Sequence, residues 1–238
     1  MEKLNATALR ALSVESFSDS KRLEAMLPSM KRLIDRAYRA GIKVPDLSWL
    51  ERSYPETAIG GDVILCFDDG HSWDLGGMVV HLPRSTVARI VEIRPSAKGR
   101  SPHALSIENK ESFYSLCNVR RSFSCLVYVG GHVNPAVAGL LSAIARSGFS
   151  ISHAGDLDPD GLLIMEEVMR SSGIAVTPHR MDGTTFDEYS RFARPLTQSI
   201  VSRLRRLDSA TLEIDGVSAL VERIRETSSG IEQEIISY

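Results

Sequence analysis

Short apolar segments alternate with helix-like segments from residue 104 onward, and this alternation constrains the fold more than any other feature. We expect four strands, at 104–109, 124–131, 149–158 and 174–178. Helical signals lie between them: Asn134 precedes Pro135 at the start of one segment, and Gly148 and Gly173 end two of them. Strands and helices that alternate in this way form βαβ units with a parallel sheet. The sequence therefore predicts an α/β fold, with a central, mainly parallel sheet flanked by helices.

The first hundred residues differ from this pattern. Residues 18–41 carry apolar side chains at helical spacing, with Pro28 at a point where the helix should kink or split. Short apolar runs at 62–67 and 78–82 are typical of strands. The predicted regions are a helical N-terminal segment at 1–60, a strand-rich connecting region at 61–100, and an α/β domain with C-terminal helices at 101–238. Those last helices are expected at 184–193, 195–207, 216–227 and 230–237.

The cysteine and hydropathy patterns favour a reduced, cytoplasmic protein. Cys66, Cys117 and Cys125 lie in apolar surroundings and form no Cys-x-x-Cys pair, which favours buried thiols over a disulfide or a zinc site. No apolar run reaches the roughly 20 residues needed to span a bilayer. The first residues do not resemble a secretory signal. We therefore expect no membrane association.

Acidic side chains follow two of the predicted strands where each strand ends. Glu108 follows the first strand, and Asp156, Asp158 and Asp160 follow the third, within HAGDLDPDG. Ligands of open parallel sheets bind at the carboxyl ends of the strands, and Mg²⁺ and Mn²⁺ prefer carboxylate oxygens. Without a cation, carboxylates this close would repel one another, so at least one would stay protonated. Asp156 or Asp158 alone could simply cap the next helix, but together the acids predict a metal site.

Basic residues flank this acidic region. Residues 151–190 hold eight acidic and two basic side chains, whereas 191–206 hold five arginines and no acid. An acidic centre with basic flanks is typical of a site that binds cations and, around them, a polyanion. Ordinary uneven surface charge is the alternative.

The acids and the residues around them resemble a known family. Glu-Asn after a first strand and Gly-Asp-x-Asp after a third are similar to the Toprim fold of topoisomerases, primases and some nucleases. The stretches SDSKRLE, LSIENKESF, VYVGGHVNPA, HAGDLDPDGLLI, PHRMDGTTF and GIEQEI resemble the C-terminal region of the JetD family, the nuclease subunits of bacterial Wadjet anti-plasmid systems. The similarity runs from about residue 15 to the C-terminus. It implies a Toprim-like domain at 101–238.

The resemblance implies a DNA endonuclease that depends on Mg²⁺ or Mn²⁺. By this resemblance Glu108, Asp156 and Asp158 are catalytic residues and metal ligands, and Glu232 and Glu234 are further candidate ligands. It makes Arg120, Arg121, Arg203, Arg205 and Arg206 candidate residues for binding double-stranded DNA. It also implies a homodimer that acts with a condensin-like SMC complex in anti-plasmid defence. Members of the family carry additional N-terminal DNA-binding elements, so the chain is expected to be either a short member or a C-terminal piece.

Two other functions are open from the sequence. A DNA transesterase like the topoisomerase VI A subunit shares the Toprim domain but needs a preceding nucleophilic tyrosine, for which the sequence offers Tyr38 and Tyr54. A non-catalytic Toprim scaffold subunit would instead dimerise and dock on a partner ATPase without binding metal.

Overall fold

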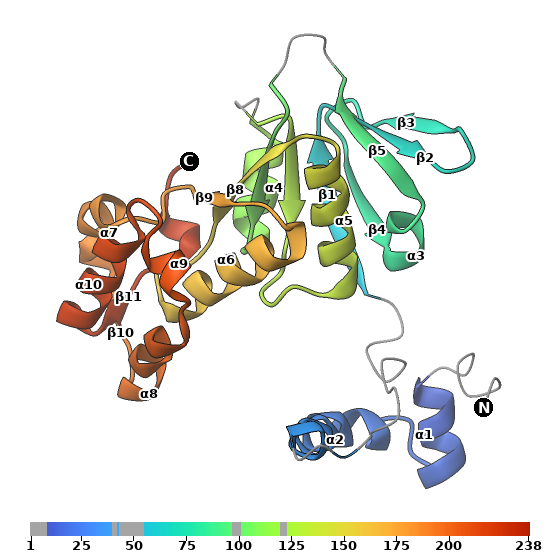
Figure 1. The fold of residues 1–238 in the computed structure, drawn as a ribbon, viewed down its shortest axis with the longest axis horizontal. Coiled ribbons are helices and arrows are strands. Elements are labelled where there is room, and N and C mark those ends of the chain that lie inside the picture. Colours follow the sequence, from blue (N-terminus) through green and yellow to red (C-terminus); the bar gives the residue numbers. More distant parts are fainter. Residues whose placement is uncertain (1–8, 40–41, 43–54, 97–100, 120–122) are drawn as a thin grey trace. The chain divides into compact units, whose positions relative to one another are not determined.

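Two compact units, Met1–Pro55 and Glu56–Tyr238, make up the chain. The computed structural model in Figure 1 describes residues 9–39, 42, 55–96, 101–119 and 123–238. In the first unit, α1 (Leu9–Phe17) packs on α2 (Arg22–Arg39). Helix α2 is continuous through Pro28, so the split that the sequence suggested is absent from this described helix. A proline inside a helix removes one backbone donor and crowds the preceding turn, but the helical spacing of apolar residues in the sequence continues on both sides of Pro28.

A six-stranded sheet in the order β4-β1-β7-β6-β8-β9 forms the centre of the second unit. Its strands are β1 (Glu56–Gly61), β4 (Val79–Pro83), β6 (His103–Ile107), β7 (Cys125–Tyr128), β8 (Ser150–Ala154) and β9 (Val176–Pro178). The pairings that join β7, β6, β8 and β9 are parallel, whereas β1 pairs antiparallel with both β7 and β4. The predicted α/β class, with a mostly parallel central sheet flanked by helices, is confirmed.

Helices cover both faces of this sheet and change sides between β6 and β8. On one face, α4 (Lys110–Cys117) buries Phe113 and Leu116 in a cluster with Leu105 and Ile107. On the other face, α5 (Pro135–Arg146) and α6 (Pro159–Ser172) lie side by side, as Figure 1 shows. Ligands of open parallel sheets bind at the point where the helices change sides, outside the carboxyl ends of the strands. A ligand-binding site is therefore expected at the carboxyl ends of β6 and β8.

The segment before residue 100 is built into the same unit. It supplies β1 and β4 to the central sheet. It also forms a second sheet of order β3-β2-β5, made of β3 (Ser72–Asp74), β2 (Val63–Phe67) and β5 (Ile90–Pro95). Helix α3 (Arg84–Val87) precedes β5. The two strands predicted here match β2 and β4. The sequence did not predict β1, whose ETAIGG ends in two glycines. A Cβ at Gly60 would lie 2.9 Å from the Cys117 sulfur, so this glycine reflects close packing rather than a turn.

Short helices and an extended tail follow β9 and form one side of the unit (Figure 1). They are α7 (Gly183–Tyr189), η3 (Ser190–Phe192), β10 (Arg194–Pro195), α8 (Gln198–Val201), η4 (Ser202–Arg206), α9 (Ser209–Leu212), α10 (Val217–Thr227), β11 (Ser229–Gly230) and η5 (Gln233–Ile235). The helix predicted at 230–237 is wrong, because Ile231 exchanges two backbone hydrogen bonds with Leu157 instead of bonding within its own segment. No helix in the described parts of the chain has the length and apolar character needed to cross a bilayer.

Candidate functional site

The carboxyl ends of β6 and β8 bring Glu108 and Asp156 into contact. The Glu108 N–H donates to the Ala154 carbonyl at 3.0 Å, which continues the parallel ladder past the end of β6. The Asp156 N–H in turn donates to Glu108 Oε2 at 3.2 Å. Both acidic residues are half-buried. The structure therefore brings together two of the acids that the sequence singled out.

Two glycines make room for this contact. A Cβ at Gly155 would lie 2.6 Å from Glu108 Oε2 and 3.1 Å from His153 Nε2. A Cβ at Gly161 would overlap the carbonyl oxygen of Asp156. Any larger residue would displace the carboxylate in the first case and the backbone that carries Asp156 in the second. The glycines around the aspartates are thus explained by close backbone approach.

Asp158 and Asp160 lie at the start of α6 and have different partners. Asp158 is the N-cap of α6, and its Oδ1 accepts a hydrogen bond from the Gly161 N–H at 2.8 Å. The capping role that the sequence allowed for Asp158 is therefore observed, and the cap fixes the orientation of the carboxylate. Asp160, in the first turn, forms an ion pair with Arg203.

The C-terminal tail closes a third side of the site through Gln233. This residue is fully buried, its N–H donates to Asp156 Oδ1 at 2.8 Å, and its Oε1 accepts from the Asn109 N–H at 2.8 Å. The flanking glutamates point to other partners: Glu234 accepts from Asn109 Nδ2 at 2.6 Å, and Glu232 pairs with Arg194 at 3.1 Å. Sequence reasoning missed Gln233, whose only signal was its place between the two candidate glutamates.

We call Glu108, Asp156, Asp158, Asp160 and Glu232 the acidic cluster. Burial, and then repulsion from Asp156, raises the pKa of Glu108 to about 8. Burial, and then the charges of Asp158 and Glu232, raises the pKa of Asp156 to about 6. Burial also raises the pKa of Asp158. The metal-free cluster therefore keeps a proton on Glu108 at neutral pH, as expected for crowded carboxylates.

The donor atoms of the cluster suit a hard divalent cation. Within the described residues, no three His, Cys, Asp or Glu side chains already converge as a ready-made metal site. Mg²⁺, however, usually keeps several waters and binds one or two carboxylates together with substrate phosphates. Glu108 Oε1 and Asp156 Oδ2 accept no hydrogen bond from the described residues, and a cation between them would relieve the repulsion that raises both pKa values. The residues present therefore fit such an ion.

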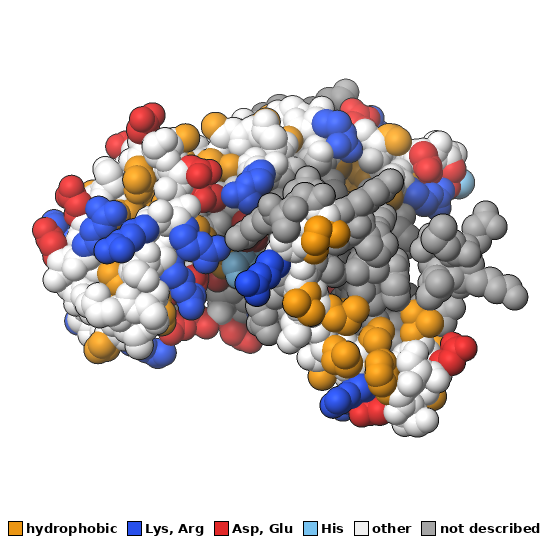
Figure 2. All heavy atoms as spheres, turned by 60° about the horizontal axis from the view of Figure 1, so that its bottom comes forward, with side chains coloured by type: hydrophobic (Ala, Val, Ile, Leu, Met, Phe, Trp, Pro, Cys, Tyr) orange, Lys and Arg blue, Asp and Glu red, His pale blue; other side chains and the backbone are white. Residues whose placement is uncertain are grey.

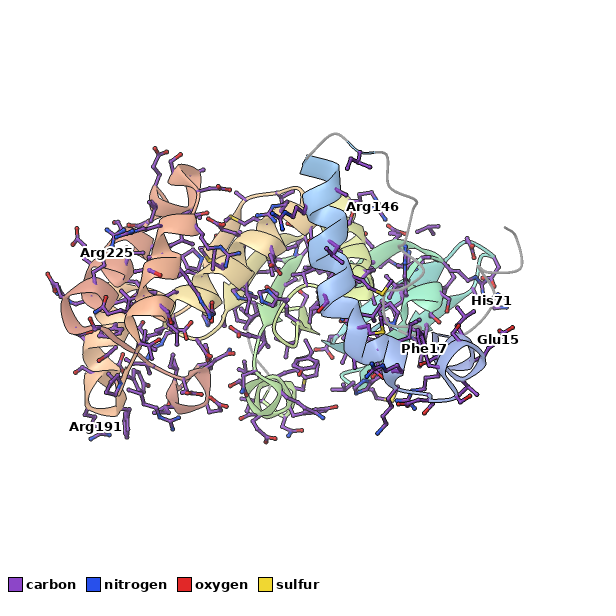
Figure 3. All side chains as sticks on the ribbon, turned by 90° about the horizontal axis from the view of Figure 1, so that it is seen from below. Glu15, Phe17, His71, Arg146, Arg191 and Arg225 are labelled. Carbon is purple, nitrogen blue, oxygen red and sulfur yellow. The ribbon has the colours of Figure 1, made fainter. Side chains whose placement is uncertain are left out.

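Arginines gather on the C-terminal segment next to the cluster. Arg203 lies in η4 beside Asp160, and the neighbouring Arg205 and Arg206 are exposed. Figure 2 shows Lys and Arg side chains together over this segment, and Figure 3 shows Arg191 and Arg225 projecting from it. The other two predicted DNA-binding residues, Arg120 and Arg121, lie outside the described residues. Sequence reasoning missed Arg194, which pairs with Glu232.

The fold and site define an α/β protein with a carboxylate cluster at the switch point of a parallel sheet. A family model described as "Wadjet protein JetD, C-terminal" matches residues 84–238, and the chain belongs to this family. The resemblance to the JetD family seen in the sequence is thereby confirmed over these residues. The matched region includes the whole acidic cluster and the C-terminal tail. Membership indicates a role in the Wadjet system. No curated protein sequence matches the chain.

Proposed function

We propose that the protein is a metal-dependent DNA endonuclease of the Toprim type, which hydrolyses phosphodiester bonds in Wadjet anti-plasmid defence. The hydrogen bond from Asp156 to Glu108 across the ends of β6 and β8 carries this proposal. It joins two acids that, within the described residues, neither cap a helix nor form an ion pair with a basic residue. Membership in the JetD family supports the same conclusion.

The side chains would divide the work as follows. A bound Mg²⁺ or Mn²⁺ ion would polarise the attacking water and stabilise the leaving oxygen. Glu108, Asp156 and Asp158 would hold the ion, with Glu232 and Glu234 nearby on the tail. Glu108, whose pKa burial and Asp156 raise to about 8, can hold a proton near neutral pH and could serve as a general acid or base.

The arginines near the acidic cluster are proposed to bind DNA, and the protein is proposed to act with partner proteins. Arg203, Arg205 and Arg206 would bind phosphates without reading bases, since guanidinium groups on a surface neutralise the backbone. We further propose, from the family resemblance, that the protein is cytoplasmic and works as a homodimer with a condensin-like SMC complex.

Nicking of a supercoiled plasmid tests the activity. Wild-type protein should nick in Mn²⁺ and not in EDTA, and Glu108→Ala and Asp156→Ala should each abolish the nicking. Asp187→Ala is a suitable control, because Asp187 is an exposed acid that pairs with Arg223 on α10. If Glu108→Ala and Asp156→Ala kept metal-dependent nicking, the assignment would be wrong. The assay is repeated with the SMC complex if the isolated protein is inactive.

The two other functions predict different results. A transesterase would leave a covalent protein–DNA adduct, and a scaffold would bind no Mn²⁺ at millimolar concentration. Tyr54 and the side chain of Tyr38 lie outside the described residues, so no structural observation favours the transesterase.

A further inference from the structure

Two arginines flank the acidic cluster, and each is paired with one of its outer carboxylates. Arg194 Nη1 lies 3.1 Å from Glu232 Oε1, and Arg203 Nη1 contacts Asp160 Oδ2. Within the part of the chain that the structure describes, these are the ion pairs that the acidic cluster forms with Lys or Arg. Both arginines belong to the segment after β9, and Figure 2 shows basic side chains gathered there.

Backbone contacts fix where the Arg194 side chain begins. Arg194 lies on β10, directly opposite Gly230 of β11. Gly230 packs against Asp158, because a Cβ added to this glycine would lie 2.8 Å from the Asp158 Cβ. The small β10–β11 ladder therefore lies against the cluster and presents Arg194 beside it.

A different set of contacts holds Arg203. It lies in η4, next to the buried Leu204, and η4 packs on α6. The Asp208 N–H donates to Glu166 of α6 at 2.6 Å, which ties the end of η4 to this helix. The charge of Arg203 also acts on Asp158, the N-cap of α6. The β10–β11 ladder thus positions Arg194, and the packing of η4 on α6 positions Arg203, so two separate parts of the structure place a guanidinium at the acidic cluster.

Both ion pairs are exposed enough to exchange partners. The exposed fractions of the side chains are 68% for Arg194 and 46% for Glu232, and 41% for Arg203 and 38% for Asp160. Ion pairs with this exposure contribute little to stability. A guanidinium binds phosphate through two parallel hydrogen bonds, which matches its planar geometry well. Each arginine can therefore leave its carboxylate for a phosphate at small cost.

We propose that Arg194 and Arg203 bind two phosphates of one DNA strand as it crosses the acidic cluster, each giving up its carboxylate to do so. This inference rests on the proposed nuclease function and specifies how that site takes its substrate. In the free protein the ion pairs neutralise Glu232 and Asp160, which would otherwise repel an approaching phosphate. The arginines thus admit a polyanion to a site whose centre is negative.

Binding of a labelled short DNA duplex, measured by fluorescence anisotropy in EDTA over a range of salt concentrations, tests the proposal. Arg194→Gln and Arg203→Gln should each weaken binding and lower the slope of log K against log salt by about 1. Arg223→Gln is the matched control, since this guanidinium is also 41% exposed and pairs with acids away from the cluster. It should leave the slope unchanged.

Substitution of Asp160, the carboxylate partner of Arg203, gives a second test. It should raise DNA affinity, whereas loss of an arginine should lower it. Asp160→Asn frees Arg203 and should strengthen DNA binding. Asp187→Asn, which frees Arg223 in the same way, should strengthen it less. Equal effects of the two aspartate variants would contradict a specific role for Arg203.

Mn²⁺ binding, measured by calorimetry without DNA, separates phosphate binding from a structural role. Removal of a nearby positive charge should leave Mn²⁺ affinity unchanged or raise it in Arg194→Gln and Arg203→Gln. Weaker Mn²⁺ binding with an unchanged DNA salt slope would overturn the proposal, because the arginines would then only position carboxylates. Absence of DNA binding by wild-type protein at low salt would overturn it as well.

Cleavage in Mn²⁺ distinguishes this inference from the nuclease proposal. If wild-type protein cleaves DNA and both arginine variants bind DNA like wild type, the phosphate contacts are wrong and the nuclease stands. If both variants lose salt-dependent binding but wild-type protein never cleaves, with or without the SMC complex, the nuclease is wrong and the phosphate contacts stand.

Discussion

The backbone N–H of Asp156 donates a hydrogen bond to the Glu108 carboxylate at 3.2 Å, although 48 positions separate the two residues. The contact depends on the parallel register of β6 and β8, in which Ile107 lies opposite Ala154. One residue past this pair, β6 supplies Glu108, and two residues past it, β8 supplies Asp156. The register of two buried strands therefore sets the distance between two acids.

Gly155 should be essential for this arrangement. In Gly155→Ala the new methyl group would lie 2.6 Å from Glu108 Oε2 and would displace the carboxylate. We expect Mn²⁺ affinity to fall by roughly 10- to 100-fold, as when the support of a metal ligand is lost. Calorimetry measures this fall. Gly139→Ala in α5, where the added Cβ meets a Val87 methyl group at 3.2 Å, is the control and should keep wild-type affinity.

The capping and metal-binding roles of Asp158 can be separated by substitution with asparagine. Asp158 and Asp182 cap α6 and α7 in the same way, accepting from Gly161 N at 2.8 Å and Thr185 N at 2.7 Å. Asparagine caps helices as well as aspartate does, so thermal unfolding should show both variants folded. Asp158→Asn should lower Mn²⁺ affinity about tenfold or more, whereas Asp182→Asn should not. Equal Mn²⁺ affinities would leave Asp158 with a capping role alone.

Gln233 should hold the C-terminal tail against the cluster. Gln233→Ala leaves the half-buried Asn109 N–H without its acceptor, which should cost about 0.5–1.5 kcal/mol in the free energy of unfolding. Amide hydrogen exchange at Asn109 should also become faster than in wild type. Gln198→Ala, an exposed residue in α8, provides the comparison and should change neither quantity. Unchanged exchange at Asn109 in Gln233→Ala would mean that the tail is held by other contacts.

His153 should make stability depend on pH. Ser106 Oγ donates to the Ser152 carbonyl, so it accepts from His153 Nδ1, and the buried Nε2 has no partner among the described residues. Burial lowers the pKa of His153 to about 3, from an ordinary value of 6.5. Between these values the unfolded chain binds a proton that the folded chain does not, so the contribution of His153 to stability is complete above pH 6.5 and falls as the pH decreases.

Chemical denaturation of wild type and His153→Gln in EDTA, at several pH values, checks this sign. The raised pKa values of Glu108 and Asp156 have the opposite effect on stability, but they act in both proteins and cancel in the difference. The advantage of wild type over the variant should shrink below pH 6.5 by up to about 1.4 kcal/mol for each pH unit. A difference that does not change with pH would contradict the neutral, buried imidazole.

Helix-capping residues and short apolar runs in the sequence were sufficient to predict most of the order of strands and helices after residue 100. Asn134 and Pro135 start α5, and Gly173, with a φ of 73°, ends α6, as the sequence indicates. The two main errors arise from contacts that no local pattern records. No strand was expected at β1, because its glycines are not typical strand residues, and Gly60 is required there by close packing against Cys117. The tail reads as a helix because its partner, Leu157, is distant in the sequence.

The residues of the site also fall into those that the sequence could predict and those that it could not. Glu108 and Asp156 could be placed together because both follow strands that a βαβ pattern makes parallel neighbours. Gln233 and Arg194 could not, because their contacts depend on where an irregular tail and a two-residue ladder cross the edge of the sheet. No periodic pattern in the sequence indicates where the C-terminal tail and the β10–β11 ladder lie.

Anomalous X-ray scattering from a crystal soaked in Mn²⁺ would locate a metal ion at the ends of β6 and β8. We expect an anomalous peak at coordination distance from the Glu108 and Asp156 carboxylates, and loss of that peak in Glu108→Gln. No peak at the ends of β6 and β8 under saturating Mn²⁺, or a peak that persists unchanged in Glu108→Gln, would contradict this expectation.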